Sequence, residues 1–316
     1  MRKIDKKISF VIPCYHSENT IEGVVEDICA EFPSDEYEKE IVLVNDGSRD
    51  GTYPKLCEIA DKNPEVVAIN LAKNFGQDGA TMCGLSEATG DYFIVLDDDG
   101  QNPPYEAHKL LLQMERGFDA VFGRYQTKKD TAFKKFGHDI NDMMATSFIG
   151  KPKTLQLNSY FVINKFVRDE MLKYKGAYPY IWGLILRCTD NISNVYVEHR
   201  AREEGKSTYT LSKLLNLWFD GFISFSVKPL RLTSLLGFVS CIMGFILTAV
   251  IILKTLHHGD VPGWPTMMAA TLVLGGMQML MIGILGEYIG RIFINGNHSP
   301  QFVIREKHQI EEQEHD

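Results

Sequence analysis

Residues Phe93–Pro104 read FIVLDDDGQNPP: an apolar run, three consecutive aspartates, a Gly-Gln-Asn turn and two prolines. The uncharged, β-favouring residues Phe93–Leu96 fit a strand that is buried on both faces, as in a parallel sheet. Open α/β sheets bind ligands just beyond the carboxyl ends of their strands, so Asp97, Asp98 and Asp99 stand where such a fold places its chemistry. This stretch therefore predicts both a fold class and the position of a site.

The three aspartates differ in the direction that an extended chain gives them. Alternation points Asp97 and Asp99 to one side and Asp98 to the other. Two close carboxylates need a counter-ion, and a hard divalent cation that also binds phosphate oxygens is one solution. A solvated acidic turn, or aspartates that cap the following helix, would fit the same residues. From this stretch alone the alternatives stay open.

Strands and helices alternate on both sides of this stretch. The expected strands are Ile8–Pro13, Glu40–Val44, Val66–Leu71, Tyr92–Leu96 and Ala120–Phe122, and the expected helices are Thr20–Phe32, a helix ending near Asp61, Gln77–Thr89 and Glu106–Arg116. Such alternation predicts a doubly wound α/β fold with a parallel sheet.

Polar residues follow three of the strands and would line one crevice: Tyr15 and Glu18, Asp46 with Ser48, and Asp97 with Asp99. Neither GxGxxG nor GxxxxGK[ST] occurs, so a dinucleotide fingerprint and a P-loop are excluded.

Composition narrows the class of protein. The chain has 316 residues, of which 45% are hydrophobic and 23% charged, and its net charge of −8 argues against a general nucleic-acid binder. The six cysteines show no metal-site spacing, so we expect reduced thiols in the cytosol. The apolar run near the amino terminus is too short for a secretory signal. We expect a folded enzyme that is not exported.

The C-terminal third carries two long uncharged stretches, Leu232–Leu253 and Val261–Gly286. Each is long enough to cross about 30 Å of hydrocarbon, which predicts two transmembrane helices; a buried core hairpin is the alternative. Basic residues flank the pair and place both ends in the cytoplasm. Glycines such as Gly286 and Gly290 would permit close helix packing, within the hairpin or in a homo-oligomer. The expected domains are 1–210 (catalytic, cytoplasmic), 211–231 (interfacial amphipathic helix), 232–294 (two spans) and 295–316 (cytoplasmic tail). Within the tail, Glu306–Asp316 is charged and expected to be disordered.

Five motifs in order carry a resemblance to a known family. They are FVIPCYHSENTI, EIVLVNDGSRDGT, NFGQDGATMCGL, GDYFIVLDDDGQNPP and REEGKSTYTLSKL, followed by the two apolar stretches. The chain resembles the polyisoprenyl-phosphate glycosyltransferases of glycosyltransferase family 2, a group that includes dolichyl-phosphate mannose synthases and bacterial undecaprenyl-phosphate sugar transferases. The resemblance covers nearly the whole chain.

The resemblance implies a glycosyltransferase A-type fold and a metal-dependent enzyme that uses Mg²⁺ or Mn²⁺. Its implied reaction is inverting transfer of a sugar, with glucose or N-acetylglucosamine favoured, from a UDP-sugar to undecaprenyl phosphate at the inner face of the plasma membrane. The product would be a lipid-phosphate sugar for cell-envelope glycosylation. The alternatives are a donor with another base, such as GDP-mannose, and a catalytically inactive membrane adaptor of the same fold.

The resemblance also assigns roles to residues that match the family's motifs. It implies metal ligands at Asp97, Asp99 and Gln101; nucleotide contacts at Pro13, Tyr15, Glu18, Asp46, Ser48, Asp97 and Asp98; catalytic roles for Asp97, Asp99, Arg202 and Lys206; and contacts to the acceptor phosphate at Arg124, Lys134 and Arg202. Two positions depart from the family pattern. Asn102 stands where a carboxylate is common, and Trp182 stands where an arginine is common.

Overall fold

The computed structural model describes residues 5–125, 152, 154–200, 263–296 and 299–310, together with scattered helical residues between 235 and 253. The chain divides into two compact units. The first comprises Met1–Thr208 and His298–Asp316, and the second comprises Tyr209–Asn297. The expected interfacial helix at 211–231, and the predicted site residues Lys134, Arg202 and Lys206, lie outside the described residues.

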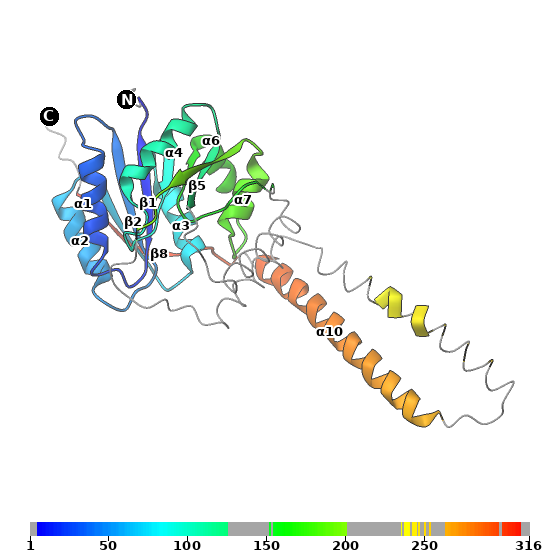
Figure 1. The fold of residues 1–316 in the computed structure, drawn as a ribbon. Coiled ribbons are helices and arrows are strands. Elements are labelled where there is room, and N and C mark those ends of the chain that lie inside the picture. Colours follow the sequence, from blue (N-terminus) through cyan, green and yellow to red (C-terminus); the bar gives the residue numbers. More distant parts are fainter. Residues whose placement is uncertain are drawn as a thin grey trace. The chain divides into compact units, whose positions relative to one another are not determined.

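The first unit is built on a sheet whose strands Figure 1 draws as arrows. The sheet has eight strands in the order β7-β5-β6-β4-β1-β2-β3-β8. Its strands are β1 (Ile8–Cys14), β2 (Lys39–Asn45), β3 (Val66–Leu71), β4 (Tyr92–Val95), β5 (Ala120–Tyr125), β6 (Phe161–Asn164), β7 (Ile192–Val197) and β8 (Ile304–His308). Its helices are α1 (Ile21–Glu31), α2 (Thr52–Lys62), α3 (Gln77–Glu87), the short 3₁₀ helix η1 (Pro104–Glu106), α4 (Ala107–Met114), α6 (Lys165–Met171) and α7 (Ile181–Cys188).

The centre of the sheet is parallel, as the sequence predicts. Strand β1 pairs with β2 on one side and β4 on the other, and β2 pairs with β3. Every residue of β1 and of β4 is buried, which explains why these strands read as continuous apolar runs. Because these strands run in parallel, their carboxyl ends meet at one edge, and Asp97 follows β4 there.

Antiparallel pairs at three places make the sheet mixed. Strand β6 runs antiparallel to both of its neighbours, β4 and β5, and β8 runs antiparallel to β3. The expectation of a mostly parallel sheet is therefore confirmed, and β6 and β8 are antiparallel strands that the sequence did not indicate. A mostly parallel sheet is what the family resemblance implies for this unit.

Helices cover both faces of the sheet. Alternate residues of β1 separate the two layers: Phe10 and Ile12 pack in one large apolar cluster with residues of α1, α2 and α4, whereas Val11 lies beside Gly84 of α3. Helix α7 contacts both α3 and α6. Burial of these apolar faces fixes the directions in which the strand ends present their polar residues.

The segment after the second unit corrects the expectation of a disordered tail. Residues Ile304–His308 form β8, whose Ile69–Lys307 and Asn70–Glu306 pairs extend the sheet beyond β3. The charged pattern IREKH suits an exposed edge strand, and it contains no apolar run from which a strand could be predicted. Residues 311–316 lie outside the described part of the chain.

The second unit contains α10 (Trp264–Gly296), a helix of 33 residues. Val273–Gly290 within it has a mean hydropathy of 1.4, and this segment is the one helix in the described part of the chain that is long and apolar enough to cross a membrane. Described residues of the first predicted span are helical and touch α10: Ser240 Oγ lies 3.1 Å from Met277 Sδ. Much of that first span lies outside the described residues.

Candidate active site

The Asp97 carboxylate lies just beyond β4 and accepts hydrogen bonds from three side chains. Gln77 Nε2 donates to Asp97 Oδ1 over 2.9 Å. Asn102 Nδ2 and Ser159 Oγ donate to Asp97 Oδ2 over 2.9 and 2.5 Å. Burial raises the pKa of Asp97, and the nearby charge of Asp99 acts in the same direction. The carboxylate is therefore held in place by donors from three separate segments of the chain.

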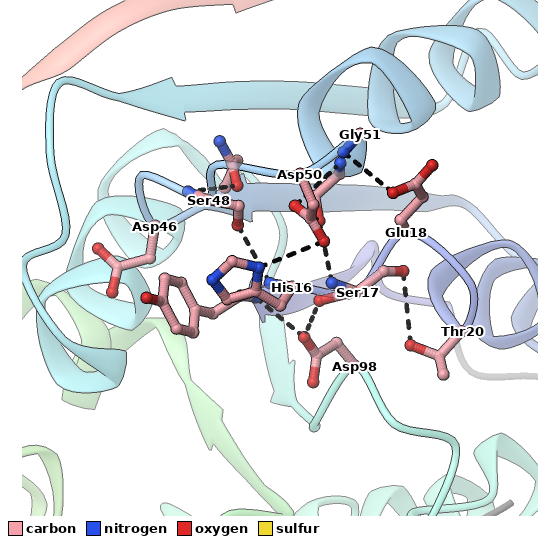
Figure 2. Close-up of polar contacts among 12 residues, drawn as sticks. His16, Ser17, Glu18, Thr20, Asp46, Ser48, Asp50, Gly51 and Asp98 are labelled. Atoms are coloured by element: carbon pink, nitrogen blue, oxygen red, sulfur yellow. Dashed lines mark hydrogen bonds and ion pairs between the residues drawn. The ribbon is translucent and has the colours of Figure 1, made fainter. Parts of the chain in front are cut away.

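Asp98 turns toward the loop that follows β1. Its Oδ2 accepts a hydrogen bond from the backbone N–H of Tyr15 over 3.0 Å and another from the Ser17 hydroxyl (Figure 2). Burial raises the pKa of Asp98 to about 6, although these two hydrogen bonds oppose the shift. Neighbouring aspartates thus contact different loops, as the alternation of an extended chain predicts.

The loops after β1 and β2 are joined to each other (Figure 2). The backbone N–H of His16 donates to Ser48 Oγ over 3.1 Å, and His16 Nδ1 lies 3.4 Å from Asp50 Oδ2. Glu18 Oε2 accepts a hydrogen bond from the backbone N–H of Gly51 over 3.0 Å. Two predicted nucleotide contacts, Ser48 and Glu18, therefore also fix the shape of this loop pair.

Asp46 ties the end of β2 to the segment that leads into α3. Its carboxylate is buried and accepts hydrogen bonds from the backbone N–H groups of Phe75 and Gly76 over 2.6 and 2.9 Å. Next to it, Gly47 adopts a φ of +65°, and a Cβ atom there would lie 2.5 Å from the backbone N of Asn74. Only glycine fits this close approach without strain.

A cavity of about 580 Å³ opens among these loops. It is lined by Tyr15, His16, Gly47, Ser48, Arg49, Asn70, Leu71, Ala72, Lys73, Asn74 and Arg305. Tyr15 is 52% exposed and offers an aromatic face. Of the predicted nucleotide contacts, Tyr15 and Ser48 line this cavity, whereas Pro13 is buried within β1 and does not.

The other predicted residues lie elsewhere. The guanidinium of Arg124, near the end of β5, lies 5.0 Å from the centre of the Tyr196 ring. The backbone N–H of Gln101 donates to Asp99 Oδ1 over 3.1 Å. The structure brings Asp97, Asp98, Asp99 and Gln101 together with the β1 loop, while Lys134, Arg202 and Lys206 fall outside the described residues.

Sequence reasoning missed the residues that surround Asp97. Ser159 reaches Asp97 because β6 lies beside β4. This antiparallel pairing cannot be predicted from a local sequence pattern. Asn102, which departs from the family's carboxylate, donates to Asp97 and accepts a hydrogen bond from the Tyr125 hydroxyl. The neutral amide can serve as donor and acceptor at once, which a carboxylate cannot do.

The carboxylates of Asp97 and Asp99 are suitable ligands for a divalent cation. In the described part of the chain no group of three or more His, Cys, Asp or Glu side chains is placed to enclose a metal. Asp97 and Asp99 alone supply hard carboxylate oxygens, so such an ion would take its other ligands from phosphate and water. Mg²⁺ and ions of similar preference are bound in this way, through one or two carboxylates plus substrate phosphates. The residues therefore fit a metal that arrives with a phosphorylated substrate.

Comparisons with known proteins agree with this geometry. The Glycosyl transferase family 2 model matches residues 9–174, and the GtrB C-terminal hairpin model matches residues 228–292. The chain belongs to glycosyltransferase family 2, and the protein is a glycosyltransferase of that family. The resemblance read from the sequence is confirmed.

Two curated relatives are similar along nearly their whole length. The undecaprenyl-phosphate 4-deoxy-4-formamido-L-arabinose transferase of Proteus mirabilis is 33% identical over 306 residues, which cover 95% of this chain and 93% of the relative. The putative glycosyltransferase CsbB of Bacillus subtilis is 31% identical over 304 residues, which cover 95% and 91%. Both alignments are long enough to include the C-terminal unit.

A solved structure shares the fold. Glucosyl-3-phosphoglycerate synthase from Mycobacterium tuberculosis, in complex with Mn²⁺, uridine diphosphate and phosphoglyceric acid, has a TM-score of 0.51 at 19% identity. The match covers 66% of this chain and 74% of that chain. This likeness establishes the glycosyltransferase A-type fold of the first unit.

Proposed function

We propose that the protein transfers a sugar from a UDP-sugar to a polyprenyl phosphate, with inversion at the anomeric carbon. The observation that carries this proposal is the placement of Asp97, Asp98 and Asp99 at the end of β4, with Asp98 bonded to the loop that also lines the cavity. The cavity suits a nucleotide, and the carboxylates suit its metal-bound diphosphate. Relatives named as undecaprenyl-phosphate transferases support undecaprenyl phosphate as the acceptor.

The roles of individual residues follow from charge. Asp97 and Asp99, with Gln101 nearby, would hold Mg²⁺ or Mn²⁺, which supplies positive charge to the departing diphosphate. Solved structures of the same fold that contain Mn²⁺ with a uridine nucleotide support this cofactor. Arg202 and Lys206 are proposed to stabilise the same leaving group, and Arg124, Lys134 and Arg202 to bind the acceptor phosphate.

The acceptor is its own nucleophile. A phosphomonoester has a second pKa of about 6 and is ionised at neutral pH, so it needs no strong general base. One acceptor oxygen forms the bond to the anomeric carbon, while the bond from that carbon to the diphosphate oxygen breaks and UDP leaves. In-line displacement converts an α-linked donor into a β-linked lipid phosphate. Positioning and charge stabilisation then account for catalysis.

Two further proposals concern the sugar that is transferred and the cellular location of the protein. Glucose or N-acetylglucosamine is favoured by the family resemblance, and the name of the Proteus mirabilis relative adds 4-deoxy-4-formamido-L-arabinose as a donor to test. We propose that residues 232–294 form two spans of the plasma membrane with the catalytic unit in the cytoplasm. The match to the GtrB C-terminal hairpin supports this arrangement.

The test uses the purified full-length protein, undecaprenyl phosphate, Mg²⁺ or Mn²⁺, and a panel of labelled UDP- and GDP-sugars. Label should enter the lipid phase from one UDP-sugar, only when metal is present, and the lipid product should be β-linked. Transfer from a GDP-sugar alone, or a product that keeps the anomeric configuration of its donor, would contradict the proposal. No transfer from any donor would favour an inactive adaptor.

A further inference from the structure

Arg305, from the C-terminal part of the sequence, lines the cavity that we propose binds the nucleotide. It belongs to β8, yet it lines the cavity beside residues of the β1, β2 and β3 loops. The pairing of β8 with β3 shifts at this point: Asn70 faces Glu306 and Leu71 faces Ile304, so Arg305 is left without a partner on β3. A β-bulge of this kind redirects a side chain, and bulges are common beside active sites.

The neighbouring cations of β8 point to other groups. Lys307 Nζ lies 3.0 Å from Glu87 Oε2, and His308 Nε2 lies 2.7 Å from Asp61 Oδ1. Neither Lys307 nor His308 lines the cavity. The bulge thus directs Arg305 to the cavity wall, whereas Lys307 and His308 point elsewhere.

Two hydrogen bonds hold the segment around Arg305 against Ala72, the residue that follows β3. The N–H of Ala72 donates to the carbonyl of Val303 over 2.8 Å, and Arg305 Nη2 donates to the carbonyl of Ala72 over 3.3 Å. This second contact uses one of the five N–H groups of the guanidinium, so the others are available to a ligand. Arg305 itself is exposed.

A chain of amides joins β8 to the predicted nucleotide contact Ser48. Asn70 Nδ2 donates to Glu306 Oε1 over 2.7 Å, and Asn45 Nδ2 donates to Asn70 Oδ1 over 2.8 Å. Asn45 Oδ1 in turn accepts a hydrogen bond from the backbone N–H of Ser48 over 3.3 Å. The strand that carries Arg305 and the loop after β2 are therefore positioned by one continuous network.

The charges of the cavity wall indicate what it binds. Its lining residues include Arg49, Lys73 and Arg305 but no aspartate or glutamate, in a chain whose net charge is −8. Three cations with no carboxylate among the lining residues favour a ligand rich in acceptor oxygens. A nucleoside diphosphate offers such oxygens on both its base and its phosphates.

We propose that Arg305 is a nucleotide-binding residue, which donates hydrogen bonds to acceptor oxygens of the donor nucleotide. This inference rests on the proposed function and deepens it: the strand that follows the second unit completes the donor site. The contact is present in ground state and transition state alike, so its loss raises the KM for the donor and leaves kcat nearly unchanged.

The experiment measures UDP binding by the full-length protein with Mn²⁺, using calorimetry, for the wild type, R305Q, R305K and the control K307Q. A charge-assisted hydrogen bond is lost in R305Q, so we expect UDP to bind about tenfold more weakly or worse. R305K keeps the charge without the planar fork and should fall between R305Q and the wild type. K307Q removes the same charge two residues away and should change the affinity by less than about twofold.

Equal affinities of R305Q and the wild type would overturn the proposal, and so would an equal loss in K307Q, because that would indicate damage to β8 as a whole. If R305Q does not fold, R305K decides alone: wild-type affinity in that variant contradicts the role of the guanidinium. A parallel titration with uridine locates the contact, since a similar loss places it on the nucleoside and a loss for UDP alone places it on the diphosphate. Failure of the wild type to bind UDP would contradict the proposed function and not the role of Arg305.

Discussion

The two sides of the sheet that flank β4 hold the site in different ways. On the side of β1, β2 and β3, Asp46 and Asp98 accept hydrogen bonds from backbone N–H groups. On the side of β5 and β6, Asp97 is held by the Asn102 and Ser159 side chains, and Gln77 adds a third side chain from α3. Two adjacent aspartates are thus fixed by opposite sides of the sheet.

This difference separates two kinds of preorganisation. Backbone donors are set by the fold and survive most side-chain substitutions, whereas Asp97 depends on residues that one substitution can remove. We therefore expect distortion of the backbone to damage the β1–β3 side most, with the Ser17 hydroxyl as the one side-chain donor to Asp98 described above. The β5–β6 side should respond to conservative changes of single side chains.

The largest effect is expected where the two sides meet. Asp99→Ala removes a proposed metal ligand and should lower kcat by about 10²–10³-fold, the usual cost of losing one group that stabilises charge in the transition state. Chelation of the metal from the wild type should lower activity to a similar level. Asp61→Ala is a control, because Asp61 is exposed and pairs with His308. Activity in Asp99→Ala above about a tenth of the wild type would remove Asp99 from the metal site.

Backbone distortion should damage the β1–β3 side. Gly47→Ala puts a Cβ atom 2.5 Å from backbone atoms of Lys73 and Asn74, at a φ of +65°. We expect the free energy of unfolding to fall by about 3 kcal/mol or more, with loss of UDP binding. Gly23→Ala, in α1 with nothing within 4 Å of the added atom, should instead stabilise the protein by about 0.5–1 kcal/mol. Chemical denaturation of both variants tests the contrast, which equal effects would contradict.

A matched pair of serine variants tests whether the adjacent aspartates act separately. Ser159→Ala removes a donor to Asp97, and Ser17→Ala removes a donor to Asp98. Each hydrogen bond to a charged group contributes about 1.5–3 kcal/mol, which corresponds to about a tenfold effect or more. Steady-state kinetics should show the loss mainly in kcat for Ser159→Ala and mainly in the donor KM for Ser17→Ala. The same kinetic parameter changing in both variants would show that the two sides act as one.

The smallest effect is expected at Asp78, where α3 meets α7. Burial raises the pKa of Asp78 to about 7, although its hydrogen bond from the backbone N–H of Ile181 opposes the shift. Because this pKa lies above that of an unfolded aspartate, about 3.9, the folded state binds more protons between pH 4 and 7. Stability should therefore fall as the pH rises through this range.

Asp78→Asn should remove the part of that dependence that Asp78 contributes and leave the part due to Asp98, whose pKa burial also raises. The full shift corresponds to about 4 kcal/mol, which partial exposure of the side chain reduces to about 1–2 kcal/mol. Denaturation at pH 5 and pH 8 should show Asp78→Asn to be the more stable protein at pH 8, with a smaller difference at pH 5. A wild type whose stability is unchanged between these pH values would contradict the shifted pKa.

The central sheet could be predicted from the sequence because its strands are continuous apolar runs. Val66–Leu71 has the bounds that the pattern indicates, β1 is one residue longer than expected at its carboxyl end, and β2 is one residue longer at each end. Strands β6, β7 and β8 escaped prediction. Strand β6 is only four residues long, β7 is partly exposed, and β8 carries three charged residues, so each is stabilised by its neighbours in the sheet more than by a pattern of its own.

The residues of the site likewise fall into those that could be predicted from the sequence and those that could not. Asp97, Asp98 and Asp99 could be located because a parallel strand ends where they begin. Ser159 and Arg305 could not, since each reaches the site through an antiparallel pairing with a strand far away in the sequence. Local patterns identify the residues that end a strand, but they do not say which distant segment will lie beside them.

Strand β8 also has a consequence for the order in which the protein is made. The ribosome releases residues 1–208 first, then the apolar unit at 209–297, and only afterwards Ile304–His308. Domains generally fold as they emerge, but here the edge of β3 must wait for a strand that is synthesised after the apolar unit. If Arg305 binds the nucleotide and residues 232–294 enter the membrane as proposed, a nascent chain acquires its full donor site only once these residues have left the ribosome. Synthesis itself would then delay full activity until the enzyme reaches its lipid.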